Sequence, residues 1–255
     1  MAVVESDLSG GVLTVTLADE ARRNALSRQL LSELTAVLDV ADADPGVRVV
    51  VLTNAGSTFC AGADLSEQAA GGGPPEPGSP TDPRVLFARF RRSPKPYVGR
   101  IAGHCVAGGM GLAAALDIAV AADDVLFGFT EVRIGVAPAM ISVVCLPKLR
   151  PADARAAFLR GRRFEAPEAA RIGLINAAVP RDQLDAEVDA VVGDLLAGAP
   201  GALAATKQLL AEVPRMPEEE AFAWTGALTA SLFAGEEARE GITAYLEKRP
   251  ATWVP

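Results

Sequence analysis

The sequence predicts a mixed α/β fold followed by a wholly helical C-terminal region. Short apolar runs typical of buried strands alternate with amphipathic helical patterns up to about residue 180. After Pro180 only helical patterns remain. Because strands that alternate with helices form a layered α/β core, we expect a core domain over residues 1–195 and a helical appendage over residues 196–255.

The composition is that of a globular chain with one large core. Half of the 255 residues are hydrophobic, and the formal net charge of −8 argues against general nucleic-acid binding. No apolar run approaches the ~20 residues that span a bilayer, and the N-terminus lacks the basic start and apolar stretch of a signal peptide. We therefore expect a cytoplasmic protein without membrane insertion.

Cysteine and histidine are too sparse for a disulfide framework or a histidine-based metal site. The three cysteines, Cys60, Cys105 and Cys145, are widely spaced, and His104 is the only histidine. This pattern predicts buried, reduced thiols and no metal site. His104 precedes the glycine-rich turn described below, so we expect a structural role for it rather than a role as a base.

The first part of the chain begins with a predicted hairpin and helix. Apolar runs at residues 3–7 and 12–17 flank Ser9-Gly10-Gly11, which predicts two strands joined by a turn. Ser27 is the predicted N-cap of a helix to about residue 41, because apolar residues then recur at helical spacing. The continuous apolar run 47–53 predicts a strand buried on both faces.

An irregular segment separates this part from the next strand. Residues 69–83 are dense in glycine and proline, which predicts a mobile surface loop. A helix is predicted over residues 84–92 and a strand over residues 97–102. This strand leads into a glycine-rich turn and then into a helix predicted over residues 110–118.

The later elements follow the same two patterns. Two short strands come first, and after them comes a turn-rich loop over residues 131–138. The predicted elements are strands 120–122 and 125–129, helices 142–149, 151–159 and 167–172, strand 173–179, and helices 183–197, 201–212, 218–234 and 236–248.

Two loops that follow predicted buried strands carry the candidate chemistry. One contains Ala63 and the other contains Gly108, at a predicted helix start. Glycine permits a close approach of the backbone, and a helix start offers unpaired N–H groups with a partial positive charge. If the two strands are neighbours in a parallel sheet, their C-terminal ends lie side by side. The N–H groups of Ala63 and Gly108 would then meet at one oxygen as an oxyanion hole, which suits a thioester enolate or a tetrahedral intermediate.

Motifs spread over nearly the whole chain share one resemblance. They are Arg23-Asn24-Ala25-Leu26, Phe59 to Leu65, Gly108 to Leu112 with Ala115 to Ile118, Phe127 to Gly135, Arg160-Gly161, Ala170 to Ile175, and Glu240 to Arg249. In this order they resemble the crotonase, or enoyl-CoA hydratase/isomerase, superfamily.

The resemblance implies a spiral of ββα units with a helical C-terminal trimerisation region, assembled as a homotrimer or a homohexamer. It implies an acyl-CoA substrate, in which coenzyme A is part of the substrate and no separate cofactor is needed. Ala63 and Gly108 would supply the oxyanion-hole donors, and Glu131 would be the acid/base. The implied substrate-binding residues are Arg23, Asn24, Ala25, Leu26, Ala61, Asp64, Leu65, Gly109, Gly111, Met140, Tyr245 and Lys248. Among them, Arg23 and Lys248 would hold the CoA phosphates, Lys248 from a neighbouring subunit, and Tyr245 would lie at the mouth of the acyl pocket.

The sequence departs from the resemblance at one catalytic position. Hydratases of this superfamily usually carry two glutamates, which position one water and share its proton transfers. The second is present as Glu131, but the first position is Gly111, which has no side chain to move a proton. The two-glutamate mechanism is therefore not expected here.

Three readings remain open. In the first reading, Glu131 assists hydration of a 2-enoyl-CoA, and other groups hold the water. The acyl group in this reading can be branched or dicarboxylic. Glu131 alone can move a proton between the α and γ carbons, which is Δ3-Δ2 isomerase chemistry. The fold can also bind acyl-CoA without catalysis, because fold does not determine reaction. Hydration is the preferred hypothesis.

Glu131 also has an interpretation without catalysis, as a surface loop residue paired with Arg133. Burial in an apolar pocket would instead raise the pKa of Glu131 toward a useful acid/base value. Asp64 and Asp117 are expected to cap helices or to form structural hydrogen bonds rather than to act in catalysis. The acyl-pocket walls are expected from residues 66–92, Met140 and the C-terminal helices.

Overall fold

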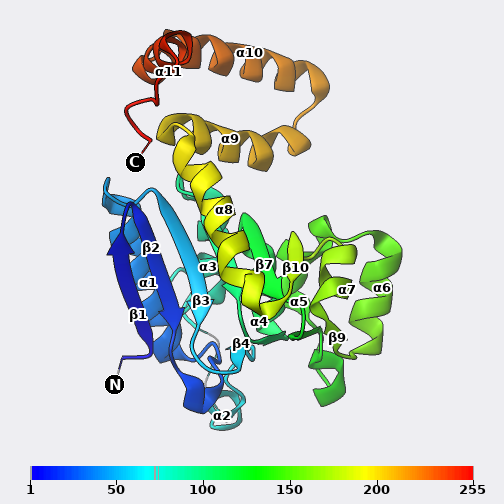
Figure 1. Ribbon diagram of the computed structural model, residues 1–255. Coiled ribbons are helices and arrows are strands. Elements are labelled where there is room, and N and C mark those ends of the chain that lie inside the picture. The colour runs from blue at the N-terminus through cyan, green and yellow to red at the C-terminus, as the bar shows by residue number, and fades with distance from the viewer. Residues whose placement is uncertain (1, 72, 74, 255) are drawn as a thin grey trace.

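Two sheets and the helices around them form the core of the protein. The computed structural model describes residues 2–71, 73 and 75–254 (Figure 1). The larger sheet has six strands in the order β1-β2-β3-β5-β7-β10, and the smaller one has four strands in the order β4-β6-β8-β9. The strands are β1 (Val4–Ser9), β2 (Val12–Leu17), β3 (Val49–Asn54), β4 (Thr58–Cys60), β5 (Tyr97–Ile101), β6 (His104–Val106), β7 (Ile118–Ala122), β8 (Leu126–Gly128), β9 (Phe164–Glu165) and β10 (Ala177–Val179).

Helices cover the faces of the sheets and build the C-terminal region. The α-helices are α1 (Arg28–Ala43), α2 (Leu65–Ala69), α3 (Pro83–Arg92), α4 (Gly108–Ala115), α5 (Ala139–Cys145), α6 (Pro151–Arg160), α7 (Ala166–Arg171), α8 (Leu184–Ala197), α9 (Pro200–Glu212), α10 (Glu218–Ala234) and α11 (Glu236–Glu247). Short 3-10 turns include η1 (Glu20–Arg22) and η2 (Glu131–Ile134).

The same connection recurs along the chain: a strand of the larger sheet is followed by a strand of the smaller sheet. β3, β5 and β7 are parallel neighbours in the larger sheet, and each is followed at once by a strand of the smaller sheet. These following strands, β4, β6 and β8, are parallel neighbours as well. The predicted spiral of ββα units is confirmed, and the C-terminal ends of neighbouring strands meet at one edge, as the two-loop hypothesis requires.

Local signals explain most of the elements. Ser27 caps α1 as predicted, because its Oγ accepts a hydrogen bond from Leu30 N at 3.2 Å. β3 is buried along its whole length, as its continuous apolar sequence indicates. The predicted hairpin forms with β1 and β2 antiparallel, and its turn residues Gly10 and Gly11 both have positive φ angles.

Four short elements were not predicted. β4, β6 and β9 have two or three residues each, and α2 has five. Such segments are too short to show a hydrophobic period. The predicted helix over 110–118 was also displaced: α4 begins at Gly108 and ends at Ala115.

The prediction that residues 69–83 lack regular structure is confirmed for the described residues of this segment. Among its described residues, no helix or strand lies between Ala69 and Pro83. Residues 72 and 74 of this predicted mobile loop lie outside the described residues. Thr35 Oγ1 donates a hydrogen bond to Pro80 O at 3.0 Å, which fixes the end of the segment to α1.

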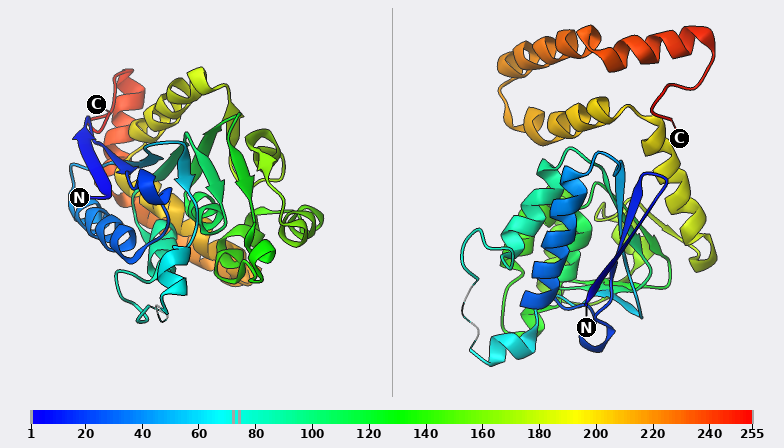
Figure 2. Two further views of the ribbon diagram at one scale, coloured as in Figure 1. Left: turned by 90° about the horizontal axis from the view of Figure 1, so that it is seen from below. Right: turned by 90° about the vertical axis from the view of Figure 1, so that its left-hand side faces the viewer.

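The C-terminal helices leave the sheet and gather at one end of the molecule (Figure 2). α8 packs against β3, β5 and β7, so the predicted boundary at residue 195 falls in the last turns of a helix that covers the sheet. α9 is joined to the core by Lys207, whose Nζ donates to Asp117 Oδ2 at 2.6 Å and to Phe90 O at 2.8 Å. Asp117 thus has the structural hydrogen-bonding role that was expected.

Within the described part of the chain, no single helix is both long and apolar enough to cross a membrane. The two segments on either side of the bend at residues 198–199 reach that length and hydropathy only together, at an angle of 107°.

Candidate active site

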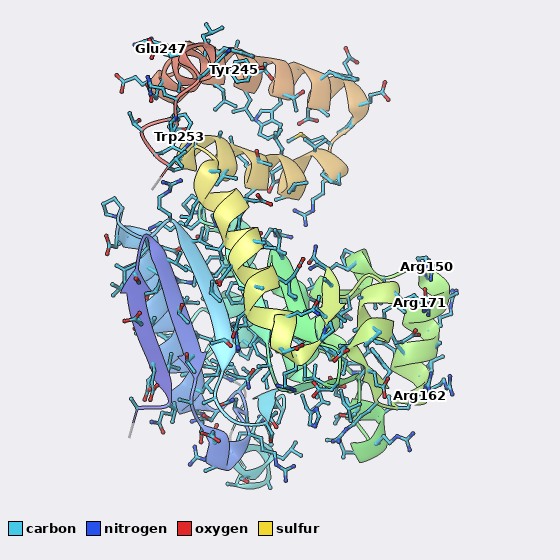
Figure 3. All side chains as sticks on the ribbon, in the orientation of Figure 1. Arg150, Arg162, Arg171, Tyr245, Glu247 and Trp253 are labelled. Carbon is cyan, nitrogen blue, oxygen red and sulfur yellow. The ribbon has the colours of Figure 1, made fainter. Side chains whose placement is uncertain are left out.

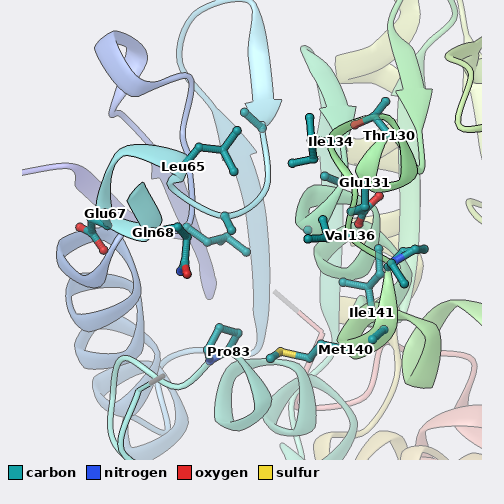
Figure 4. Close-up of a pocket in the computed structure, with 18 of the residues that line it drawn as sticks. Leu65, Glu67, Gln68, Pro83, Thr130, Glu131, Ile134, Val136, Met140 and Ile141 are labelled. Atoms are coloured by element: carbon teal, nitrogen blue, oxygen red, sulfur yellow. The ribbon is translucent and has the colours of Figure 1, made fainter. Parts of the chain in front are cut away.

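A cavity of about 820 Å³ opens between two walls at the end of the smaller sheet. Figure 4 shows Leu65 and Gln68 on one wall and Glu131, Val136 and Ile141 on the facing wall. The lining residues include Leu26, Arg28, Ala61, Ala63, Leu65, Glu67, Phe87, Ala107, Gly108, Thr130, Glu131, Arg133, Ile134, Val136, Met140, Ile141, Gly161, Arg162 and Arg163. A cavity of this size with mostly apolar walls and a few polar groups is typical of a small-molecule site.

Two backbone N–H groups on the first wall are free to bind an oxygen. Ala63 follows β4 and Gly108 begins α4 after β6, and both residues line the cavity. Within the described part of the chain, neither N–H donates a hydrogen bond. The two groups are adjacent, because a Cβ built on Gly108 would lie 3.5 Å from Ala63 N.

Close packing of the two loops brings these N–H groups together. Gly62 has a φ of +89°, and a Cβ there would lie 2.7 Å from Gly108 N. A Cβ on Gly109 would lie 2.4 Å from Cys60 O. Only glycine fits at either position, so Gly62 and Gly109 determine how closely the loops approach.

Ala107 holds the peptide that carries the Gly108 N–H in an unusual conformation. Its φ of 49° and ψ of −124° lie where residues other than glycine are strained. Hydrogen bonds at both sides maintain it: Ala107 N donates to Gly128 O at 2.9 Å, and Ala107 O accepts from Met110 N at 2.9 Å. The strain is thus stored next to the candidate donor.

Glu131 is the candidate acid/base on the facing wall. It begins η2, and burial raises the pKa of its carboxyl above the ordinary value for glutamate. Its Oε2 atom is buried and has no hydrogen-bond partner among the described residues. A buried carboxylate oxygen without a partner is costly in a folded chain and marks a group that is available for a ligand or for proton transfer.

The position of the absent first glutamate is filled by aliphatic and aromatic atoms. A Cβ built on Gly111 would lie 2.4 Å from Ile141 Cγ2 and 3.2 Å from Phe87 Cζ. Gly111 is therefore buried beneath Ile141 and Phe87 and does not line the cavity. The carboxylates among the described lining residues are Glu67 and Glu131, and Glu67 accepts hydrogen bonds from Arg28 N.

Arg133 does not pair with Glu131, so the interpretation as a surface ion pair is wrong. The guanidinium of Arg133 donates from Nε to Gly161 O at 3.0 Å and from Nη2 to Arg160 O at 3.2 Å. Arg133 lies on the same turn as Glu131 but bonds to the C-terminal end of α6.

The structure brings together seven of the residues predicted for the site. Those that line the cavity are Leu26, Ala61, Ala63, Leu65, Gly108, Glu131 and Met140. Those that do not line it in this chain are Arg23, Asn24, Ala25, Asp64, Gly109, Gly111, Tyr245 and Lys248.

Several of the residues outside the cavity support its loops instead. Asn24 is fully buried, and its Nδ2 donates to Thr58 O at 2.7 Å. Asp64 caps α2 through Oδ1, as expected for that aspartate. Arg23 is exposed in side chain, but its carbonyl oxygen accepts from Ala61 N at 3.1 Å.

Tyr245 and Lys248 lie far from the cavity of their own chain. Tyr245 is 83% exposed on α11 (Figure 3). Lys248 directly follows that helix as its C-cap, with a φ of 56°. α11 and α2 lie at opposite ends of the molecule. All described lining residues lie between Leu26 and Arg163, so the expected contribution of the C-terminal helices to the acyl-pocket wall is wrong for a single chain.

The expected wall from residues 66–92 and Met140 is confirmed, since Glu67, Phe87 and Met140 line the cavity. Arg28, Ile141 and Arg163 also line it and were not predicted. The expected structural role of His104 is confirmed, since its Nδ1 accepts a hydrogen bond from Leu126 N at 3.0 Å.

Comparisons with known proteins agree with this geometry. Residues 7–254 match the family model of enoyl-CoA hydratase/isomerase. Enoyl-CoA hydratase EchA19 of Mycobacterium tuberculosis is 34% identical over 98% of this chain and 97% of its own length. Carnitinyl-CoA dehydratase of Escherichia coli is 34% identical over 96% of this chain and 95% of its own length. The crystal structure of an enoyl-CoA hydratase from Mycobacterium smegmatis has a TM-score of 0.88 at 31% identity and covers 99% of both chains.

The chain belongs to the enoyl-CoA hydratase/isomerase family, that is, to the crotonase superfamily. It is an acyl-CoA enzyme of this family.

Proposed function

We propose that this enzyme adds water across the double bond of a 2-enoyl-CoA, with Glu131 as its single acid/base. One observation carries the proposal: the buried, unpartnered Oε2 of Glu131 faces the same cavity as the free N–H groups of Ala63 and Gly108. These are the parts that an addition through a thioester enolate needs, namely a proton carrier and two oxyanion donors.

The proton and electron pair can be followed atom by atom. Ionised Glu131 takes a proton from water while the water oxygen bonds to C3 of the enoyl group. The π electron pair of C2=C3 moves toward the thioester oxygen, which becomes an enolate oxygen held by Ala63 N–H and Gly108 N–H. The protonated Glu131 then returns its proton to C2, the C2–H bond forms, and a 3-hydroxyacyl-CoA results.

The environment of Glu131 suits both halves of this cycle. A carboxyl whose pKa is raised by burial is a stronger base when ionised and stays protonated long enough to act as an acid. Ile134 and Val136 are apolar lining residues, so a bound acyl group would cover them and displace water, which would strengthen the hydrogen bonds to the enolate oxygen.

Isomerase activity is the second candidate, and the filled space above Gly111 favours it. Ile141 excludes a second carboxylate from that position. A single carboxylate is sufficient to remove a proton from C2 of a 3-enoyl-CoA and return it to C4, which shifts the double bond to C2=C3. In this reaction no water is consumed.

The acyl group proposed for this site is short or branched. Ile134, Val136 and Met140 form an aliphatic wall without a buried polar group, which suits a branched acyl chain. Arg162 and Arg163 lie on the same side of the cavity, and they make a dicarboxylic acyl group the alternative.

We infer that the enzyme assembles as a homotrimer or homohexamer through its C-terminal helices. α10 has no buried residue within one chain, and its Phe222 and Phe233 are 72% and 71% exposed. Exposed aromatic residues on one helical region are typical of a protein interface. Such an assembly would also bring Lys248 of one subunit toward the CoA phosphates bound by another. Light scattering of the purified protein tests this, and a monomeric mass would contradict it.

Product analysis across a small panel of enoyl-CoA thioesters tests the proposed function. Hydration predicts loss of the conjugated absorbance of 2-enoyl-CoA and formation of a 3-hydroxyacyl-CoA. Isomerisation predicts conversion of 3-enoyl-CoA to 2-enoyl-CoA without a hydroxylated product. Binding without turnover of either substrate would contradict both reactions and support a non-catalytic acyl-CoA-binding protein.

A further inference from the structure

The turn that carries Glu131 has few anchors of its own. η2 spans only four residues, and within it no side chain caps its first turn. The side chains after Glu131 are largely exposed, with Val132 at 40% and Ile134 at 58%. A short turn with so little buried apolar surface needs other contacts to keep one conformation.

The C-terminal end of α6 supplies these contacts. α6 ends at Arg160, and its C-cap Gly161 has a φ of 56°. The last carbonyl groups of a helix lack partners within the helix. Arg133 donates to two of these carbonyl oxygens, those of Arg160 and Gly161. A cation at this end also interacts favourably with the partial negative charge of the helix.

Packing around the guanidinium strengthens the same junction. A Cβ on Gly161 would lie 2.5 Å from Val132 Cγ2, so η2 rests directly on the backbone at that residue. Phe129, which lies two residues before Glu131, contacts Phe158 of α6 with ring centroids 4.0 Å apart. The turn and α6 therefore meet over a ring contact, a backbone contact and two hydrogen bonds.

The direction of the Arg133 side chain matters for the charge of Glu131. If the guanidinium faced Glu131, its positive charge would lower the pKa of the carboxyl. The guanidinium instead donates its hydrogen bonds to the carbonyl oxygens at the C-terminal end of α6. Cys145 of α5 interacts electrostatically with Glu131, but burial raises the pKa of this thiol to about 12, so it is neutral. Arg162 and Arg163 also line the cavity, and among the described residues neither forms an ion pair with Glu131.

We propose that Arg133 is a positioning residue: by capping α6 it holds η2 in place and keeps the Glu131 carboxylate partly desolvated and unpaired in the cavity. This inference rests on the proposed function of Glu131 as acid/base. Arg133 does not touch the reacting atoms, and its effect passes through the conformation of the turn.

Arg133→Met tests this role, because methionine keeps an apolar stem but cannot donate to the carbonyl oxygens. We expect kcat to fall by about 10- to 100-fold with KM within about threefold, as for a displaced catalytic group. The acidic limb of the kcat profile should move to lower pH, because a loosened carboxylate gains water. Arg133→Lys should recover part of the activity, since one ammonium donor can still reach a carbonyl oxygen.

Arg150→Gln is the matched control, because Arg150 is an exposed arginine at the other end of α6 that pairs with Asp153. It should leave kcat and the pH profile unchanged. A kcat of Arg133→Met within twofold of wild type, or a reduced kcat with an unmoved acidic limb, would overturn the positioning role.

A carboxyl titration by NMR separates this inference from the proposed function. With ¹³C-labelled glutamate, the signal that Glu131→Gln removes identifies Glu131, and its pKa should be lower in Arg133→Met than in wild type. An unchanged pKa overturns the inference even if the wild type is active. Wild type that turns over no enoyl-CoA overturns the proposed function, and the titration still decides the role of Arg133.

Discussion

The two walls of the cavity are built in different ways. On the wall of β4, β6 and α4, the candidate donors belong to the backbone, and closely packed glycines place them. On the facing wall, the candidate acid/base is a side chain on an exposed turn, and contacts with α6 place it. The backbone donors are thus positioned by close packing that only glycine permits. Glu131 is positioned by the contacts between its turn and α6.

Among changes to the first wall, the largest effect should follow from separating the two donor loops. Gly62→Ala adds a Cβ 2.7 Å from Gly108 N and forces alanine to a φ of +89°, so the loops must move apart. We expect turnover of enoyl-CoA to fall by about 10³-fold, since loss of one oxyanion donor alone costs about 10² to 10³. Steady-state kinetics with a 2-enoyl-CoA measures this.

Gly10→Ala is the control for the strain of a positive φ. Gly10 has a φ of +55° in the β1–β2 turn, and nothing lies within 4 Å of its Cβ position. It should lower stability slightly and leave turnover unchanged. Equal losses of turnover in both variants would show that loop separation is not the cause.

A double-mutant cycle tests whether Ile141 fills the space above Gly111. Gly111→Ala alone should lower the free energy of unfolding by about 1–3 kcal/mol, because the new methyl overlaps Ile141 Cγ2. Ile141→Ala alone should cost about 2–4 kcal/mol. In the double variant the two changes compensate, and the loss should be smaller than their sum by at least about 1 kcal/mol. Denaturant unfolding at one protein concentration measures the cycle, and strict additivity would contradict the packing account.

Relief of the backbone strain at Ala107 should raise the stability of the fold and lower its turnover of enoyl-CoA. Ala107→Gly removes a side chain from a strained conformation, and we expect a net gain of about 1 kcal/mol after the greater freedom of glycine in the unfolded chain is subtracted. Turnover should fall by roughly three- to tenfold because the Gly108 N–H is less firmly oriented. Thermal unfolding and kinetics of the same sample test both parts, and unchanged turnover would show that the strain does not orient the donor.

The smallest effect concerns the stability cost of Glu131. Its pKa is raised in the folded state, so the folded chain binds the proton more tightly and loses stability as pH rises from the ordinary glutamate pKa through the raised one. Glu131→Gln should therefore stabilise the fold at neutral pH by at most about 1 kcal/mol, since solvent contact screens part of the cost. Below the ordinary glutamate pKa the gain should vanish. Unfolding of both proteins across pH measures this difference, and a destabilised variant at neutral pH would contradict it.

The sequence predicted the first wall better than the second, for a physical reason. Backbone donors at Ala63 and Gly108 depend on local features, a strand end and a glycine-rich turn, which can be read from neighbouring residues. The two loops lie side by side as expected, although the parallel strands that directly precede them are the unpredicted β4 and β6. Most helices were predicted for the same local reason, and α10 was predicted with its observed bounds.

The contacts of the second wall join residues that are distant in sequence. Arg133 reaches residues 160 and 161, and Ile141 covers Gly111 thirty positions earlier. No local period or spacing indicates such pairs. The same limit explains why Tyr245 and Lys248 were assigned to the site from the resemblance, although in one chain they lie on α11 and at its C-cap, at the far end of the molecule.

Turnover and affinity of Glu131→Gln, measured together, test the central claim most directly. Glutamine keeps the size of the side chain but cannot carry the proton. The account predicts that turnover of a 2-enoyl-CoA falls by about 10² to 10⁴, while the Kd for an acyl-CoA changes by less than about threefold. Unchanged turnover with unchanged affinity would contradict the role of Glu131 as the acid/base.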